Sequence, residues 1–469
     1  MSLDGGKQNE DAVAFMPVVS SSARVTGPRR VELVSEKVVY RTNLQKPAKV
    51  GLLMVGWGGN NGSTLTAALV ANRNRVSWRT RTGRHGMNLA DALDRAQVLE
   101  PELRDQVRSE LSSMVPMRAP FYADFVAGNQ AERADNVLPG GDGDKAGHLA
   151  QLRGDLRAFR AAHPGMDKVF VVWTANTERL ARVDEPGVHD SADALLRAIQ
   201  TSHPQVSCST LFGVAAALEG AVYINGSPQN TFVPGLVDLA TRCGTHVAGD
   251  DFKSGQTKLK SVLVDFLVGA GLRPVAIASY NHLGNNDGRN LSEAAQFRAK
   301  ELSKTNVVDD MVASNPVLYP PTNNNNNKSH QLMHMMGPDH LVVIKYVPAV
   351  GDSKRAMDEY ETEIFMGGRS TIAVHNVCED SLLAAPLILD LVLLAELLTR
   401  VKTAGKDETF RSMNTVLSLL SYMLKAPLVP EGRPVVNALF KQRAAIENLF
   451  RALVGLPPVD PLCIEQRLA

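Results

Sequence analysis

An unbroken apolar run that ends in glycines and leads into a helix-forming segment constrains this chain most. Residues 49–59 read KVGLLMVGWGG, and STLTAALVAN follows at 63–72. An apolar run without alternation is typical of a strand buried on both faces of a parallel sheet. A Ser/Thr start followed by good helix formers predicts a helix. The strand, turn and helix together predict an α/β fold.

Further segments repeat this pattern. DKVFVVWTANTE (167–178), the strand within AAALEGAVYINGSPQNTFVPG (215–235) and THVAGDDF (245–252) are apolar runs that end in polar residues, and residues 152–162 form an amphipathic helical pattern. Strands that alternate with helices predict a Rossmann-like, doubly wound parallel sheet, which binds ligands at the carboxyl ends of its strands.

The pattern changes after residue 258. RPVAIASYNHLG (273–284), HLVVIKYVPAVGDSK (340–354) and TIAVHNVCED (371–380) are strand-like, with less helix between them. This predicts an inserted α+β sheet domain. We expect an N-terminal segment at 1–45 that packs with the C-terminal part, a nucleotide-binding domain at 46–256, the inserted domain at 257–372, and a return to the first domain at 373–469.

Charge and cysteine usage exclude several classes of protein. Lys+Arg number 50 and Asp+Glu 49, so no net field favours nucleic acid or an anionic membrane. The acidic N-terminus does not resemble a secretory signal, and we expect a cytoplasmic protein. The cysteines show no CxxC spacing, which predicts reduced thiols without a zinc site; they are Cys208, Cys243, Cys378 and Cys463.

One apolar stretch is long enough to be mistaken for a membrane span. Residues 382–401 read LLAAPLILDLVLLAELLTRV and contain Pro386, Asp390 and Glu396. Charged side chains at the centre of a bilayer are costly. We therefore predict a buried helix.

The glycine turn predicts a dinucleotide site. Gly56, Gly58, Gly59 and Gly62 lie where backbone amides and a helix dipole can hold a pyrophosphate. The acidic residue expected about twenty positions later, which binds the ribose, is absent. Arginines occupy that region instead, so either a phosphorylated ribose is bound or the arginines form a solvated face, which we favour; they are Arg73, Arg75, Arg79, Arg81 and Arg84.

Longer blocks make the chain resemble the inositol-3-phosphate synthase family of eukaryotes. The asparagine pair in GWGGNNGS is unusual among dinucleotide folds, and the likeness continues through VVWTANTER, GDDFKSGQTKLKS, SYNHLGNNDG, GDSKRAMDEY, LSYMLKAPL and KQRAAIENL. The resemblance covers residue 49 to the C-terminus. It implies an NAD-dependent isomerase of inositol and phospholipid biosynthesis that converts glucose 6-phosphate to inositol 3-phosphate. It also implies a homotetramer assembled through the inserted domain.

The chain departs from the family pattern at one place. SWRTRTGRHG runs almost directly into MNLADAL, where the family has a longer segment. The family's ribose-binding aspartate falls on Gly83, and a segment is missing between Gly83 and Met87. A strand of the sheet is therefore expected to be shortened or lost, with fewer contacts to NAD.

The resemblance assigns cofactor and phosphate contacts residue by residue. The cofactor residues are Gly56, Gly58, Gly59, Asn60, Asn61, Gly62, Thr174, Ala175, Thr177, Gly249, Asp251, Asn281, Asp287, Asp380 and Ser381. The phosphate contacts are Ser254, Gly255, Gln256, Thr257 and Lys304. From residue type alone, the SGQT run at a helix start offers hydroxyl, amide and backbone donors to a phosphate, or is a capped helix without a ligand.

The resemblance also implies catalytic lysines. They map onto Lys300, Lys354 and Lys441. We assign Lys300 and Lys441 to proton transfer and oxyanion stabilisation and Lys354 to polarising the aldehyde oxygen. Asp251 and Asp287 are expected to orient lysines or the nicotinamide ribose, because a carboxylate beside a buried ammonium keeps both charged.

Nearby polar residues receive lesser roles. Asn285 and Asn286, with Asn281, are expected to supply neutral hydrogen bonds. His282 and His375 have no second histidine at ligand spacing, so we predict no metal site. Two alternatives remain open: another NAD(P)-linked sugar-phosphate oxidoreductase, and a catalytically impaired paralogue that keeps the oligomeric scaffold.

Overall fold

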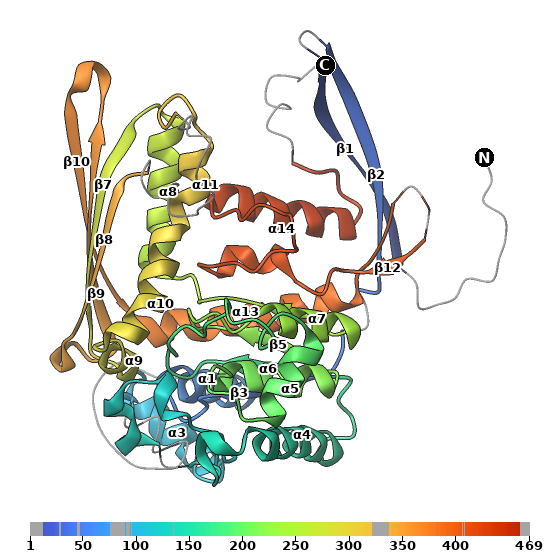
Figure 1. The fold of residues 1–469 in the computed structure, drawn as a ribbon, viewed down its shortest axis with the longest axis vertical. Helices are drawn as coiled ribbons and strands as arrows, with labels where there is room; N and C mark the ends of the chain where they lie inside the picture. The colour runs from blue at the N-terminus through green and yellow to red at the C-terminus, as the bar shows by residue number, and fades with distance from the viewer. Residues whose placement is uncertain are drawn as a thin grey trace.

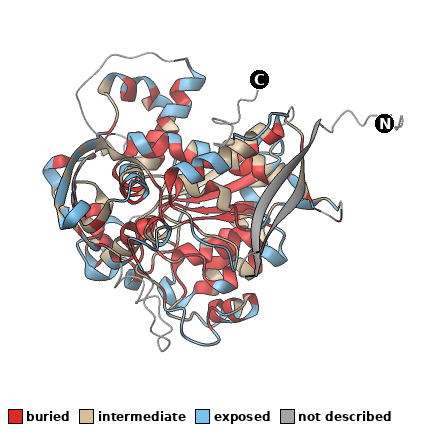
Figure 2. Cartoon of the chain, turned by 90° about the horizontal axis from the view of Figure 1, so that it is seen from above, coloured by how far each residue is buried: buried red, intermediate tan, exposed pale blue. Residues whose placement is uncertain are grey.

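The computed structural model describes most of the chain as three groups of elements (Figure 1). The described residues are 13–27, 30–44, 47–75, 90, 94, 96–134, 136–320, 337–405, 407 and 409–459, with backbone alone up to residue 37. Within them the strands form three four-stranded sheets. Figure 2 shows buried residues gathered in the middle of the molecule, between the sheets and their helices.

The central sheet is parallel, as predicted. Its strands are β3 (Val50–Val55), β4 (Lys168–Trp173), β5 (Val222–Asn225) and β6 (Val247–Ala248), paired in the order β3-β4-β5-β6. Val55 lies opposite Trp173, and Trp173 lies opposite Asn225, so the strands end at one edge. Among the described residues no strand follows the first helix before residue 101, where a shortened or lost strand was expected.

Helices cover both faces of this sheet, which confirms the α/β prediction. Val169 and Val171 pack on one face with α4 (Lys145–Ala162), α5 (Ala192–Gln200), α6 (Cys208–Leu218) and α7 (Pro234–Arg242). Phe170 and Val172 point to the other face. There they meet α1 (Asn60–Arg73) and α13 (Asp380–Arg400), and α1 is flanked by α3 (Pro101–Leu111).

Helix α13 confirms the prediction of a buried core helix. In the described part of the chain it is the one helix long and apolar enough to cross a membrane, and half of its most apolar window is buried. Ile388 and Leu391 are fully buried against the central sheet. Its length and composition are therefore explained by packing on the sheet.

The second sheet contains the strands predicted after residue 258, but it extends past the expected domain end at residue 372 because its last strand continues to Glu379. Its strands are β7 (Arg273–Leu283), β8 (Asp339–Tyr346), β9 (Ser353–Glu363) and β10 (Arg369–Glu379), in the order β10-β9-β7-β8. Its inner face packs against α8 (Gly255–Gly269) and α11 (Asp309–Ala313). The short α9 (Asn286–Asn290) and α10 (Ala294–Thr305) connect this sheet to the central one (Figure 1).

The third sheet brings the N-terminal segment beside the C-terminal part. It contains the long hairpin of β1 (Val13–Gly27) and β2 (Arg30–Thr42), with β11 (Lys402–Ala404) and β12 (Arg411–Ser412). Arg41 in β2 pairs with Lys402 in β11. The last helix, α14 (Leu439–Leu453), contacts both β1 and α8.

Candidate active site

The glycine turn between β3 and α1 has a conformation that side chains would disrupt. Gly56 has φ of +89°, and a Cβ there would lie 2.8 Å from the backbone nitrogen of Ala175. A Cβ on Gly62 would lie 2.3 Å from the carbonyl oxygen of Trp57. The turn therefore brings bare backbone to the N-terminus of α1, which is the geometry that a pyrophosphate requires.

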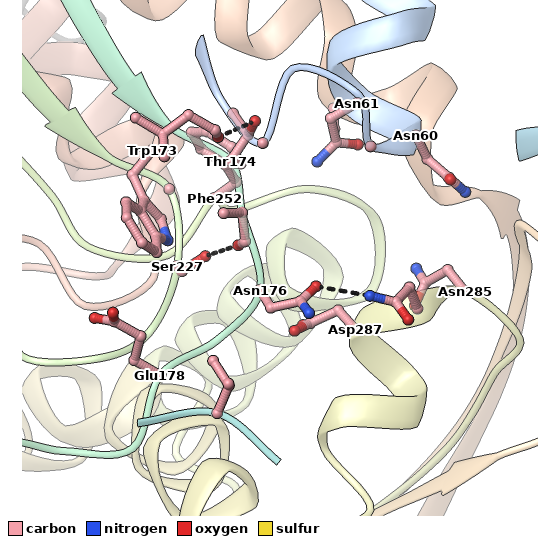
Figure 3. A pocket seen from close by; sticks show the side chains of 18 of the residues that line it. Asn60, Asn61, Trp173, Thr174, Asn176, Glu178, Ser227, Phe252, Asn285 and Asp287 are labelled. Carbon is pink, nitrogen blue, oxygen red and sulfur yellow. Dashed lines mark hydrogen bonds between the residues drawn. The ribbon is translucent and has the colours of Figure 1, made fainter. Parts of the chain in front are cut away.

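A cavity of about 430 Å³ opens at the carboxyl ends of the central strands. Its wall includes Val55, the last residue of β3, Thr174, which follows β4, and Ser227, which follows β5. Figure 3 shows Asn60 and Asn61 on one side of this space and Trp173 and Glu178 on another. The cavity continues to the ends of β7 and α10, so both domains contribute to it.

Asp251 organises two amino groups on the cavity wall. Its Oδ1 accepts from Lys300 Nζ at 2.9 Å and from Lys425 Nζ at 3.1 Å, and its Oδ2 accepts from the Ser303 hydroxyl. All these side chains are largely buried. One carboxylate therefore faces two lysines in a poorly hydrated site.

The pKa values of the three ionisable groups in this cluster are shifted in different directions. Burial opposes the ionisation of Asp251, yet Lys300 and Lys425 hold its pKa below the usual range. Burial also disfavours charge on Lys300, but Asp251 and Asp287 outweigh it and raise the pKa of this lysine. Burial lowers the pKa of Lys425 to about 7, with Asp251 opposing the shift. Since a single carboxylate compensates one ammonium, Lys425 holds its proton less tightly than Lys300.

Sequence reasoning missed Lys425. A distant segment carries it to the site by backbone pairing: Lys425 N donates to Asp251 O at 2.7 Å, and Asp250 N donates to Ala426 O at 2.7 Å. The available signal was a lysine inside the apolar block LSYMLKAPL, because an isolated lysine among buried residues needs a partner.

The prediction that Lys441 shares this pocket is wrong. Leu439 and Gln442 turn into the protein at the start of α14, which leaves Lys441 exposed on the outward face of the helix. Lys441 is absent from the cavity wall, and the buried amino group facing Asp251 beside Lys300 belongs to Lys425. The KQR block resembles the family because it begins a packed helix.

The other two predicted lysines do reach the cavity. Lys354 Nζ lies 3.5 Å from Asp380 Oδ1, at the start of α13. Lys304 Nζ donates to Gln256 Oε1 at 3.0 Å and to Asn281 Oδ1 at 2.9 Å. Burial, together with the neighbouring lysines, lowers the pKa of Lys304 well below its ordinary value. An anion in the cavity would relieve this cost.

Of the predicted phosphate contacts, the structure places Ser254 and Lys304 on the wall. Ser254 precedes α8 as its N-cap residue, but its hydroxyl makes no capping hydrogen bond and is available to a ligand. The side chains of Gln256 and Thr257 are buried outside the wall, and Gly255 also lies outside it. The first turn of α8 can still offer backbone N–H groups.

Most predicted cofactor residues line the cavity, and a few support it. Gly62, Thr177 and Gly249 lie outside the wall. Asp287 accepts from Thr177 N at 2.9 Å and from Thr177 Oγ1 at 3.1 Å, which ties α9 to the loop after β4. Those on the wall are Gly56, Gly58, Gly59, Asn60, Asn61, Thr174, Ala175, Asp251, Asn281, Asp287, Asp380 and Ser381.

A polar group behind the cavity wall was also missed: Asp352 does not line the cavity but contacts two residues that do, Asn60 and Ser381. Asp352 accepts from Ser381 N at 2.9 Å, from Ser381 Oγ at 2.8 Å and from Asn60 Nδ2 at 3.2 Å. It joins α13 to the glycine turn. Asn286 Nδ2 donates to Asn176 Oδ1 at 3.1 Å. Asn285 also lines the cavity, so the expected polar loop is present.

His282 and His375 are exposed side chains of the second sheet. Both lie outside the cavity wall. Across the described residues no three His, Cys, Asp or Glu side chains come together as metal ligands.

The family profile described as myo-inositol-1-phosphate synthase matches residues 50–89 and 85–451. The chain belongs to this family. It is 50% identical to the inositol-3-phosphate synthase of Drosophila melanogaster, over 94% of this chain and 84% of that protein. It is 49% identical to human inositol-3-phosphate synthase 1, over 95% and 85%.

Solved structures agree with the fold. The crystal structure of inositol-3-phosphate synthase from Caenorhabditis elegans superposes with a TM-score of 0.89 at 42% identity, covering 98% of each chain. A synthase-related protein from Thermotoga maritima, at 19% identity and a TM-score of 0.60, shares the fold over 88% of this chain.

The comparisons also mark the expected missing segment. The alignment with the Drosophila protein spans 493 positions; because 94% of 469 residues is about 441, about fifty positions have no residue here. The family match breaks and restarts at residues 85–89. Gly83 and Met87, between which we placed the gap, lie outside the described residues, as do Arg79, Arg81, Arg84 and Cys463.

Proposed function

We propose that this chain binds NAD and converts D-glucose 6-phosphate to 1D-myo-inositol 3-phosphate. One observation carries the proposal: amino groups from Lys300, Lys354 and Lys425, which are far apart in the sequence, line one cavity beside the glycine turn. Such a cavity suits a sugar phosphate lying against a dinucleotide. The family relationship supports this reaction and gives no support to an impaired paralogue.

The residues of the turn fit a dinucleotide. Bare backbone at Gly56 and Gly62 and the amides at the start of α1 would hold the pyrophosphate, with Asn60 and Asn61 beside them. Bound NAD supplies a hydride acceptor that is regenerated within one turnover. Arg73 pairs with Glu110 at the surface, as a solvated face would.

The lysines are proposed to handle protons and developing negative charge. Ring closure joins the terminal carbons of the hexose, so the carbon beside the phosphate-bearing one must become a ketone before it is reduced again. Lys425 is proposed to exchange protons, while Lys300, held protonated by Asp251, stabilises the oxyanion beside it. Lys354 would polarise the aldehyde oxygen.

The phosphate is assigned to Lys304, Ser254 and the first turn of α8. Lys304 donates hydrogen bonds to two neutral amides, those of Gln256 and Asn281, so a dianion in the cavity would supply the missing negative charge. Gly255, Gln256 and Thr257 contribute through the backbone of this turn. Holding the phosphate here fixes the sugar against the lysines.

We also propose a cytoplasmic homotetramer that serves inositol and phospholipid synthesis. Support for self-association comes from the outer face of the second sheet, where cross-strand pairing puts four exposed apolar residues on one side. They are Tyr280 at 42%, Leu341 at 49%, Met357 at 48% and Val377 at 53% exposed. These residues lie among exposed charged side chains such as Arg355 and Glu359, and their apolar area favours burial between copies of the chain.

Purified protein tests the proposed reaction. Incubation with glucose 6-phosphate and NAD should yield an inositol phosphate, measured by phosphorus NMR, without a lasting rise in absorbance from NADH. Stoichiometric NADH would favour the sugar-phosphate oxidoreductase. No product and no NADH, from protein that still binds NAD, would favour the impaired paralogue.

A further inference from the structure

Behind the cavity wall, a buried chain of polar groups links β9 to Lys304. Asp358 in β9 is 2% exposed, and its Oδ1 accepts from Gln256 Nε2 at 2.6 Å. Its Oδ2 accepts from the Tyr360 hydroxyl at 3.1 Å. Gln256 Oε1 in turn accepts from Lys304 Nζ at 3.0 Å. The order is therefore carboxylate, amide, ammonium.

The chemistry of the carboxylate fixes the orientation of the amide. An ionised carboxylate only accepts hydrogen bonds, so it must face the NH2 group of Gln256. The carbonyl oxygen of Gln256 is then forced toward Lys304. Asn281 is fixed in the same way, because its Nδ2 donates to Val343 O at 3.2 Å and its Oδ1 faces Lys304.

With an anion bound, this arrangement leaves Lys304 with a hydrogen for the cavity. The anion favours the charged form of Lys304; an ammonium has three donors, and two of them are taken by Gln256 and Asn281. Lys304 lies on the cavity wall, whereas Gln256 and Asp358 do not. The direction of the remaining N–H therefore depends on the two amide oxygens, and one of these depends on Asp358.

We propose that Asp358 is a positioning residue for substrate phosphate: by locking the Gln256 amide, it aims Lys304 into the cavity. The proposal rests on the proposed function for the identity of the substrate. Asp358 does not line the cavity and acts through Gln256 and Lys304. Its charge also compensates a second buried lysine, Lys260, whose Nζ donates to Ser279 Oγ at 2.7 Å.

Asp358→Asn tests this directly. The asparagine keeps the shape but can present either end of its amide, so Gln256 is free to turn its NH2 toward Lys304, where two donors would conflict. Loss of a hydrogen bond with a charged partner corresponds to about tenfold or more in affinity. We expect KM for glucose 6-phosphate to rise about tenfold, with kcat changed less than threefold and NAD affinity unchanged.

Tyr360→Phe is the matched control. It removes a hydrogen bond to the same carboxylate but leaves the oxygen that faces Gln256, so KM should stay near the wild-type value. Thermal melting of each variant checks the fold. An unchanged KM in Asp358→Asn, or an equal rise in Tyr360→Phe, would overturn the proposal.

Two further measurements test the role of Asp358 even if its asparagine variant does not fold or the proposed reaction is wrong. If Asp358→Asn does not fold, Gln256→Met must show the same rise in KM, and a wild-type KM in that variant would refute the linkage. Calorimetric titration with inorganic phosphate, in the presence of NAD, gives affinities without turnover. A wild-type protein that makes no inositol phosphate would therefore defeat the proposed function while the titration still decides on Asp358.

Discussion

At the scale of single residues, the site consists of more buried lysines than carboxylates in contact with them. Asp251 serves both Lys300 and Lys425, and Lys304 has amide partners. Buried positive charge without full compensation is unfavourable until an anion arrives. The site is thus built to bind a dianionic substrate and to exchange a proton while doing so.

Replacing Lys425 and Lys441 in separate variants tests which of the two is the catalytic lysine, the one assigned from the structure or the one assigned from the sequence. Lys425→Met removes a buried amino group that faces Asp251, so turnover should fall by about 10² to 10⁴, as for loss of a general acid or base. Lys441→Met changes an exposed side chain and should leave turnover nearly unchanged. Steady-state kinetics of both variants decides, and a larger loss in Lys441→Met would reverse the assignment.

Substrate binding should take up protons at pH 8. The pKa of Lys425 is about 7 in the free site, so this lysine is largely neutral at pH 8, and a bound dianion raises its pKa. Calorimetry with glucose 6-phosphate in buffers of different ionisation enthalpy measures the uptake. Lys425→Met should show less uptake; equal uptake in both proteins would place the proton elsewhere.

Single functional residues could be predicted from the sequence where a local motif determines the backbone conformation. The glycine turn is one such place, since Gly56 and Gly62 are required by contacts with neighbouring backbone. Prediction failed where the contact spans the chain: Lys425 meets Asp251 across 174 positions. The spacing of residues along the sequence does not reveal a contact between such distant residues. This is why Lys441 was predicted as a catalytic lysine and Lys425 was not.

At the scale of elements, the strands were predictable because each kind of sheet imposes its own pattern of apolar and polar residues on the sequence. Strand β4 is apolar after Lys168 and buried on both faces, whereas β9 alternates between buried and more exposed residues. Boundaries were less certain: α4 begins at Lys145, earlier than the amphipathic pattern at 152–162 suggested, because Asp144 caps it. The joints between elements, such as Asp352 to Ser381, required the structure.

The turn from β3 to α1 should tolerate alanine unequally. Gly56→Ala places a methyl group at φ +89° and 2.8 Å from backbone, so we expect a loss of about 1 to 3 kcal/mol in stability and weaker NAD binding. At Gly58 the nearest atom to a Cβ is 3.9 Å away, so Gly58→Ala should melt close to the wild type. Equal melting temperatures for the two variants would contradict this reading.

The joint between α14 and the loop before α8 should make stability depend on pH. Lys253 donates to Asn437 O at 3.0 Å and to Gln442 Oε1 at 3.2 Å, and burial lowers its pKa to about 7. Between pH 7 and its ordinary value near 10.5, the unfolded chain binds a proton that the folded chain lacks. The free energy of unfolding therefore rises with pH in this window.

Lys253→Met removes that contribution. Urea unfolding at pH 7.5 and pH 9.5 should give a smaller increase in stability for the variant than for the wild type. An identical increase would mean that Lys253 keeps its proton in the folded protein.

At the scale of the whole molecule, two domains must keep a fixed position relative to each other for one reaction to take place. The central sheet supplies the dinucleotide turn and Asp251, while the second sheet and its helices supply Lys300, Lys304 and Lys354. Self-association through the outer face of the second sheet would hold this domain without covering the cavity, which faces the central sheet. The fold class was evident from sequence, but which chain segments meet at the cavity was not.

Met357→Glu tests the proposed self-association. Met357 is 48% exposed and lies opposite Tyr280 on the outer face, so a charge there should oppose burial between copies. Sedimentation velocity should show a tetramer for the wild type and smaller species for the variant. A monomeric wild type, or a tetramer in both proteins, would refute this interface.

One cavity is proposed to oxidise the sugar, close the ring and return the same hydride. Glucose 6-phosphate carrying deuterium at the carbon next to the phosphate-bearing one follows that hydride directly. Mass spectrometry of the inositol phosphate formed with unlabelled NAD should find the deuterium retained at one position. Product without deuterium, or deuterium accumulating in free NADH, would contradict the account.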